Sequence, residues 1–184
     1  ETFDHPNIVN MLGRFEMFYT YFIIVEYIDG MSLYELIRIN GPLPEADVRA
    51  ILGQLVTALD YAHRSEIIHR DIKPGNVMLG RDGQVKLMDF GLAKMMEEVR
   101  RGTTVLGGTP SYMSPEQAAC KKVDCRSDIY SLGLVYYELL TNQPAYPSDD
   151  DEEILKLVRE GDILHHPDML RSDIPDEIVM MLMR

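Results

Sequence analysis

Two short polar segments, each directly after an apolar run, constrain the fold of this chain more than any other feature. Residues 69–76 read HRDIKPGN and follow the apolar pair 67–68, while residues 89–91 read DFG and follow the apolar run 85–88. Short apolar runs bounded by polar turns indicate short strands. If these strands are neighbours, we expect three polar side chains to converge at their ends: Asp71, Asn76 and Asp89.

The three side chains suit the transfer of a phosphoryl group. A nucleoside triphosphate is neutralised by a divalent metal with hard oxygen ligands, here the carboxylate of Asp89 and the amide oxygen of Asn76. The attacking hydroxyl needs a carboxylate that orients it and accepts its proton, and Asp71 is the candidate. Lys73 supplies positive charge where negative charge collects on the transferred group. The fixed order and spacing of these residues carry the hypothesis, since each one alone is uninformative.

The composition is that of a folded domain with an acidic surface. The 184 residues are 46% hydrophobic and 26% charged, with a formal net charge of −12. Such a surface repels nucleic-acid phosphates and anionic lipid, so we expect no nucleic-acid or membrane contact within this segment. The apolar runs are too short to span a bilayer. Cys120 and Cys125 are expected to be free thiols in a reducing compartment.

The first forty residues are expected to hold strands and one short helix. Aromatic and β-branched residues predict strands at 9–18 and 21–27, joined by a turn at Tyr19 and Thr20. Ser32 is expected to cap a helix at 33–39, because its hydroxyl can accept a hydrogen bond from a free backbone N–H of the first turn.

The rest of the chain is mostly helical by periodicity. Apolar spacing and acidic first turns predict helices at 44–62, 129–140 and 149–160, and another from 175 onward. Charge occurs only once in 129–140, so this helix is expected to be buried on nearly all sides. The stretch from 91 to about 115 lacks periodicity, which is typical of a functional loop or of disorder.

The polar segments resemble the signature of the protein kinase family. Residues 69–76 are similar to its catalytic loop, in the serine/threonine form, and residues 89–91 are similar to its metal-binding motif. Residues 5–9, 25–28 and 108–116 resemble the entry to the fourth strand, the hinge and the peptide-docking platform of the same family. Serine at position 114, followed by Gln117, makes the chain most similar to the bacterial eukaryotic-type kinases.

This resemblance implies an ATP site that uses Mg²⁺, held by Asn76 and Asp89. Val25 would occupy the gatekeeper position, and Met78 would form the floor under the adenine. Backbone groups of Glu26 and Ile28 would face the adenine from the hinge. The expected partners are therefore ATP and protein substrates.

The resemblance also implies regulation by phosphorylation. Arg70 would pair with a phosphate on the activation segment, with Thr103 and Thr104 as the acceptors. The alternative is that both threonines are ordinary polar loop residues.

Other residues are implied to support the site. Thr109 would hold the catalytic loop through its hydroxyl, and Asp128 would anchor that loop from a buried helix. In the family the residue that matches Glu116 pairs with a late arginine, which is expected beyond Arg184. The hydrophobic stack that links the two lobes of a kinase would include His69, Phe90 and Met11.

We therefore expect an α+β, protein-kinase-like fold that consists mainly of the helical C-lobe, with the hinge and the last N-lobe strands. Residues 1–184 would be a partial kinase domain, with 1–27 as the end of the N-lobe and 28–184 as the C-lobe. The family's glycine-rich loop, third-strand lysine and helix glutamate cannot be placed in this segment, so the segment alone is expected to be inactive. The expected location is the cytoplasm, with a membrane anchor elsewhere in a longer protein left open.

Two other functions remain open from the sequence. A small-molecule kinase of the same fold would share Asp71 and Asn76, although the lysine–proline pair 73–74 and the platform 108–116 favour a peptide substrate. A pseudokinase or a truncated binding module is the non-enzyme alternative. The acidic run 149–153 could attract basic substrates, but such a run more often starts a helix and stays solvated.

Overall fold

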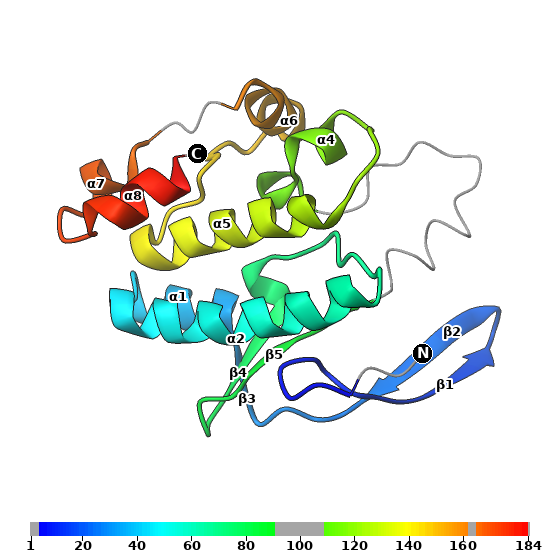
Figure 1. Ribbon diagram of the computed structural model, residues 1–184. Helices are drawn as coiled ribbons and strands as arrows, with labels where there is room; N and C mark the ends of the chain where they lie inside the picture. Colours follow the sequence, from blue (N-terminus) through cyan, green and yellow to red (C-terminus); the bar gives the residue numbers. More distant parts are fainter. Residues whose placement is uncertain (1–3, 91–108, 162–164, 184) are drawn as a thin grey trace.

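The computed structural model describes residues 4–90, 109–161 and 165–183, in which two small sheets lie beside a larger layered group of helices (Figure 1). The first sheet is an antiparallel hairpin of β1 (Met11–Met17) and β2 (Thr20–Val25). The second sheet has the order β3–β4–β5, with antiparallel neighbours at Gly30–Ser32, Val77–Gly80 and Val85–Leu87. This α+β arrangement is the expected class.

The hairpin confirms the two predicted strands with shorter bounds. Its turn lies at Phe18 and Tyr19, with φ angles of 54° and 58°, so the predicted turn at Tyr19 and Thr20 is wrong by one residue. Two-residue turns with positive φ at both positions match the right-handed twist of the strands they join, and this outweighs the strain at bulky residues. Phe15 pairs with Phe22 across the hairpin, and their rings stack with centroids 5.0 Å apart.

The helices before the polar loop follow the sequence closely. Helix α1 (Leu33–Asn40) begins after Ser32, whose hydroxyl accepts a hydrogen bond from the backbone N–H of Glu35 at 3.2 Å, as predicted. Helix α2 (Glu45–Arg64) begins after Pro44, which cannot donate a backbone hydrogen bond and so suits a helix start. Its buried face consists of Val48, Ile51, Leu55, Ala58, Leu59 and Ala62.

The remaining helices pack on both sides of α5 (Cys125–Thr141). In Figure 1, α5 lies between the α1–α2 layer and the short α4 (Pro115–Ala118) with α6 (Asp151–Glu160). Two further helices, α7 (Pro167–Leu170) and α8 (Asp176–Leu182), contact the C-terminal part of α5. Helix α5 is buried on nearly all sides, as expected, but begins earlier than predicted because Asp124 caps it.

The acidic run 149–153 is the start of α6. Asp150 accepts a hydrogen bond from the backbone N–H of Glu152 at 3.0 Å, and the acids of the first turn are exposed. Negative charge at a helix N-terminus is favourable because it faces the positive end of the helix dipole. This placement supports the structural interpretation of the run.

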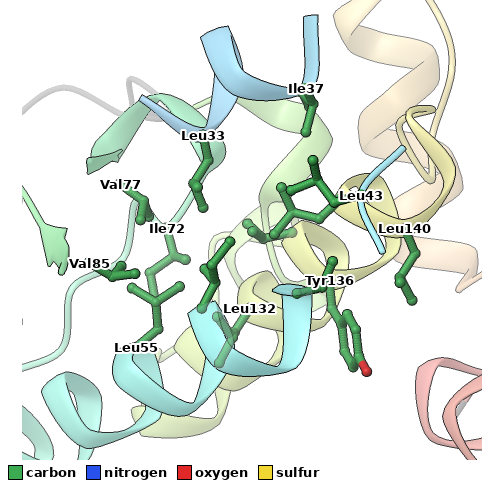
Figure 2. Packing of buried hydrophobic residues seen from close by; sticks show 14 of the residues in the cluster. Leu33, Ile37, Leu43, Leu55, Ile72, Val77, Val85, Leu132, Tyr136 and Leu140 are labelled. Atoms are coloured by element: carbon green, nitrogen blue, oxygen red, sulfur yellow. The ribbon is translucent and has the colours of Figure 1, made fainter. Parts of the chain in front are cut away.

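The main hydrophobic core lies between α2, α5 and the small β3–β4–β5 sheet. Figure 2 shows side chains of α1, α2, the polar loop, the sheet and α5 in contact. Ile72 belongs to this core and is 1% exposed, although it lies between the polar residues Asp71 and Lys73. Full burial of an aliphatic side chain contributes about 1.5–3 kcal/mol, so Ile72 fixes the polar loop to the core.

The strand predicted at residues 67–68 is absent from the described structure. Residues 67 and 68 lie outside any strand, and the backbone N–H of Ile67 donates to the carbonyl of Ala62 at 3.0 Å. Two residues are too few to establish a strand register, and the end of α2 satisfies this backbone instead. The polar loop 69–76 therefore follows a helix rather than a strand.

Candidate active site

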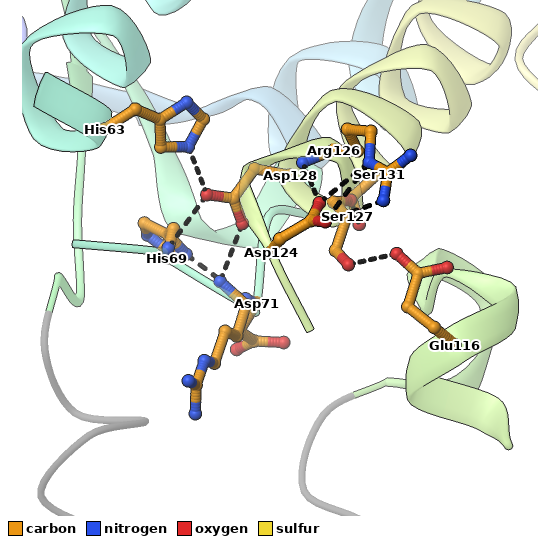
Figure 3. Close-up of polar contacts among 10 residues, drawn as sticks. His63, His69, Asp71, Glu116, Asp124, Arg126, Ser127, Asp128 and Ser131 are labelled. Atoms are coloured by element: carbon orange, nitrogen blue, oxygen red, sulfur yellow. Dashed lines mark hydrogen bonds and ion pairs between the residues drawn. The ribbon is translucent and has the colours of Figure 1, made fainter. Parts of the chain in front are cut away.

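Asp128 of α5 holds the start of the polar loop from inside the core. Its side chain is 0% exposed, and its Oδ2 and Oδ1 accept hydrogen bonds from the backbone N–H groups of His69 at 2.9 Å and Arg70 at 2.8 Å (Figure 3). The Nε2 of His63 lies 2.7 Å from Oδ2. A buried carboxylate is tolerated when donors surround it in this way. These bonds attach the start of the loop to α5, and the anchoring role of Asp128 stays a prediction.

His69 ties the loop to the strand that precedes Asp89. Its Nε2 donates to the carbonyl of Met88 at 2.7 Å, and its Nδ1 accepts from the backbone N–H of Asp71 at 3.2 Å. The two partners require the neutral ring with its proton on Nε2. Burial lowers the pKa of His69, which also favours this form. The rings of His69 and Phe90 pack edge to face with centroids 4.6 Å apart, and the wider stack with Met11 stays a prediction.

The Asp71 carboxylate lies at the centre of the predicted catalytic residues. Asn76 Nδ2 donates to Asp71 Oδ2 at 2.9 Å and to the Asp71 backbone carbonyl at 2.8 Å. Lys73 Nζ lies 2.9 Å from the same Oδ2 and donates to Thr109 Oγ1 at 3.2 Å. The structure thus brings together Asp71, Lys73 and Asn76, and connects them to Thr109 across the segment 91–108, which lies outside the described residues.

The predicted metal ligands lie next to each other. The backbone N–H of Met88 donates to the carbonyl of Asn76 at 2.8 Å, so the residue before Asp89 is fixed to Asn76. Asp89 is exposed and has a φ of 62°. Within the described residues, both hydrogen bonds of the Asn76 side chain are donated by Nδ2, so no described donor occupies its Oδ1. An amide oxygen and a carboxylate are the donor types that Mg²⁺ prefers, so these residues fit the metal.

The hinge residues are less closely grouped. Val25 ends β2 and is 49% exposed, and Met78 lies in β4. The Glu26 carboxylate accepts hydrogen bonds from Lys86 Nζ at 2.6 Å and from the backbone N–H of Asn10 at 2.8 Å. Burial works to raise the pKa of Glu26, but these two bonds lower it. A pocket of about 310 Å³ beside this pair includes Ile28 but neither Val25 nor Met78.

The platform residues are fixed to α5 by buried polar contacts. Figure 3 shows Ser127 donating to the carboxylate of Glu116. Burial works to raise the pKa of Glu116, but this hydrogen bond lowers it below its usual value. The hydroxyl of Tyr112 donates to Glu138, and burial raises the pKa of both groups. Glu116 therefore has a structural partner within residues 1–184.

Two predicted residues cannot be placed, and three functional contacts were not predicted. Thr103 and Thr104 lie outside the described residues. The contacts of His63, Ser127 and Gln117 were missed by sequence reasoning. His63 follows Leu59 by one helical turn on the buried face of α2, and a polar residue on such a face was an available signal. Gln117 lies in the four-residue helix α4, which is too short to show a period, and Ser127 lies in the first turn of α5, before the predicted start of that helix.

The fold and the site define the class of protein. The chain matches the protein kinase domain family over residues 1–179. Because the match covers nearly the whole chain, the chain belongs to this family. The predicted fold and the predicted family are therefore confirmed.

The curated relatives include bacterial serine/threonine kinases. The probable serine/threonine-protein kinase PknB of Bifidobacterium longum is 41% identical over 158 residues, which cover 79% of this chain and 23% of that protein. PknB of Mycolicibacterium smegmatis is 35% identical over 167 residues, covering 89% of this chain and 26% of that protein. PrkC of Bacillus subtilis is 42% identical over 142 residues, covering 76% and 22%. The chain thus aligns with 22–26% of the length of these relatives.

No helix among the described residues combines the length and the apolarity that a membrane span requires.

Proposed function

We propose that the protein transfers the γ-phosphoryl group of ATP to serine or threonine hydroxyls of other proteins. The observation that carries this proposal is the arrangement around Asp71, in which Lys73 and Asn76 both contact Oδ2 at 2.9 Å. Among the described residues none donates a hydrogen bond to Oδ1 of Asp71, so this oxygen can accept one from the substrate hydroxyl. A carboxylate held in one orientation by its neighbours is what a positioned base requires.

The reaction assigns a task to each residue of the site. Asp71 orients the substrate hydroxyl and takes its proton as the oxygen bonds to the γ-phosphorus, while the bond from that phosphorus to the bridging oxygen breaks and ADP leaves. Lys73 places positive charge beside the reacting groups, where negative charge collects. The side-chain oxygens of Asn76 and Asp89 would hold Mg²⁺, which when bound neutralises the phosphate oxygens.

The nucleotide would lie between the hinge and the small β3–β4–β5 sheet. We propose, from the resemblance, that Val25 is the gatekeeper, that backbone groups of Glu26 and Ile28 bind the adenine, and that Met78 lies under it. The assignment of 1–27 to the N-lobe and 28–184 to the C-lobe belongs to the same proposal. A cytoplasmic location for the domain also follows from the need for ATP.

The contact between Lys73 and Thr109 favours a protein substrate over a small molecule. It joins the loop 69–76 to the platform 108–116, and a platform of this kind serves extended peptide substrates. We further propose that Thr103 and Thr104 accept phosphates that Arg70 binds, because the family resemblance assigns them these roles.

The test is phosphate transfer by the complete protein to a generic basic protein, with the acceptor residues identified by mass spectrometry. We expect phosphoserine and phosphothreonine only, and loss of transfer when EDTA removes Mg²⁺. The same spectra of the kinase itself should show phosphate on Thr103 or Thr104. Transfer that persists in EDTA, or phosphate on tyrosine alone, would contradict the proposal.

A further inference from the structure

Gln117 makes hydrogen bonds in two directions from one side chain. It is the third residue of α4, and its Oε1 accepts from the backbone N–H of Ser114 at 3.0 Å, while the Ser114 hydroxyl accepts from the backbone N–H of Gln117 at 3.4 Å. Its Nε2 donates to the backbone carbonyl of Arg70 at 2.8 Å, 47 residues away in the chain. One amide therefore caps a helix of the platform and bonds the catalytic loop.

The helix cap alone does not explain why residue 117 is a glutamine. Helix α1 has the same reciprocal cap at its start, made by Ser32 and Glu35, whose carboxylate oxygen accepts from the Ser32 N–H at 2.9 Å. A capping box needs only an acceptor at this position, so glutamate serves as well as glutamine. The N–H donor of Gln117 is thus additional to the cap, and Arg70 is its partner.

The bond to Arg70 fixes the peptide group that leads into Asp71. The carbonyl of this peptide accepts from Gln117 at 2.8 Å, and its N–H, which belongs to Asp71, donates to His69 Nδ1 at 3.2 Å. Arg70 has a φ of 69°, a conformation that costs a non-glycine residue about 1–3 kcal/mol and persists only where the surrounding contacts hold it. Both ends of the peptide are therefore held, and its plane sets the direction in which the Asp71 side chain leaves the backbone.

We infer that Gln117 is a positioning residue for phosphoryl transfer: it acts through the Arg70–Asp71 peptide to hold Asp71 in its reactive orientation. This inference rests on the proposed kinase activity. It also makes α4 part of the support of the catalytic loop, so that the substrate platform and the base are held by one side chain.

Two substitutions separate the two bonds of Gln117 in the complete protein. Gln117→Glu keeps the acceptor for Ser114 but places a carboxylate oxygen against the Arg70 carbonyl, where the donor was. Gln117→Lys keeps a donor within reach of Arg70 but loses the acceptor for the cap. We expect Gln117→Glu to lower kcat at least about 10-fold with KM for ATP within about 2-fold, because transition-state stabilisation is lost and ground-state binding is not. Gln117→Lys should retain kcat within about 3-fold of wild type.

Helix α1 supplies matched controls. Glu35→Gln makes the reciprocal change in the other capping box, and Ser32→Ala removes that cap; both should leave kcat unchanged, while Ser32→Ala lowers the stability of the domain. A loss of kcat in Gln117→Lys that equals or exceeds the loss in Gln117→Glu would show that the donor to Arg70 does not set kcat, and would overturn the inference. Wild-type kcat in a folded Gln117→Glu protein would do the same. If Gln117→Glu does not fold, Gln117→Lys is compared with Gln117→Ala: equal kcat in these two overturns the inference, and higher kcat in Gln117→Lys supports it.

Amide hydrogen exchange distinguishes this inference from the proposed function. The segment 69–76 should exchange faster in Gln117→Glu than in wild type or Gln117→Lys, whether or not the protein transfers phosphate. If the wild-type protein transfers no phosphate but the variants still differ in exchange in this way, the kinase proposal is refuted. The role of the contact between Gln117 and Arg70 in holding the loop is then still supported. Identical exchange in all the variants would refute the positioning role.

Discussion

The carboxylate of Asp128 shows how much of the site depends on single buried atoms. Each of its oxygens accepts a backbone N–H of the catalytic loop, and Oδ2 also meets His63 at 2.7 Å. A carboxylate accepts in several directions and needs no donor of its own, which makes it suited to adjacent N–H groups. The start of the loop therefore has its backbone position set from α5.

Asp128→Asn tests this anchor. Asparagine is the same size, but its amide nitrogen would face a backbone N–H of the loop, leaving a buried donor unsatisfied. Because such a group costs about 1–3 kcal/mol and more beside charged groups, we expect the domain to lose at least about 2 kcal/mol of unfolding free energy. Urea denaturation monitors the loss. Asp124→Asn is the matched control on the same helix, since asparagine caps a helix as well as aspartate and stability should not change.

At the scale of elements, the packing of α2 against α5 carries the loop between them. Leu55 of α2 is 0% exposed and lies in the same core as Ile72 of the loop and Leu132 of α5 (Figure 2). Because the catalytic loop starts directly after α2 and is anchored by α5, the position of one helix relative to the other determines where the loop lies.

Leu55→Ala should therefore destabilise the domain by about 2–5 kcal/mol, since it removes buried methyl groups and leaves a cavity at the α2–α5 contact. The neighbouring Val56 is 49% exposed, so Val56→Ala should change stability by no more than about 0.5 kcal/mol. Thermal unfolding of the two variants makes the comparison. A similar effect of both substitutions would contradict the assignment of this face of α2 to the core.

The same elements show what the sequence could predict. The buried faces of α2 and α5 were readable because apolar residues recur at helical spacing, and the cap at Ser32 has a local chemical signature. The strand β3 was missed because three residues around Gly30 carry no period; its backbone approaches β4 so closely that a Cβ at Gly30 would lie 2.1 Å from the carbonyl oxygen of Leu79. The long-range contact of Gln117 with Arg70 had no signal in the sequence, whereas the contacts of the loop with Asp128 and Thr109 were expected from the family resemblance alone.

For the molecule as a whole, the fold brings together the residues that resemble the catalytic loop and the metal-binding motif of a kinase. Asp71, Lys73 and Asn76 form one network, and Asp89 lies beside it through the bond between Met88 and Asn76. The spacing of these residues predicted that they converge, but the structural reason differs from the expected one. The loop 69–76 follows helix α2 rather than a strand, and the strands beside the site are β4 and β5. The adenine residues were inferred by resemblance alone, and their roles stay predictions.

The most direct test of the account is the rate of phosphate transfer from ATP by the complete protein carrying Asp71→Asn. Loss of a positioned base lowers such rates about 10²–10⁴-fold, so we predict a fall of at least about 100-fold with the domain still folded. Asp60→Asn, which alters an exposed ion pair with Arg64 on α2, is the control and should transfer phosphate at the wild-type rate. Equal rates for Asp71→Asn and wild type would contradict the assignment of Asp71 as the base.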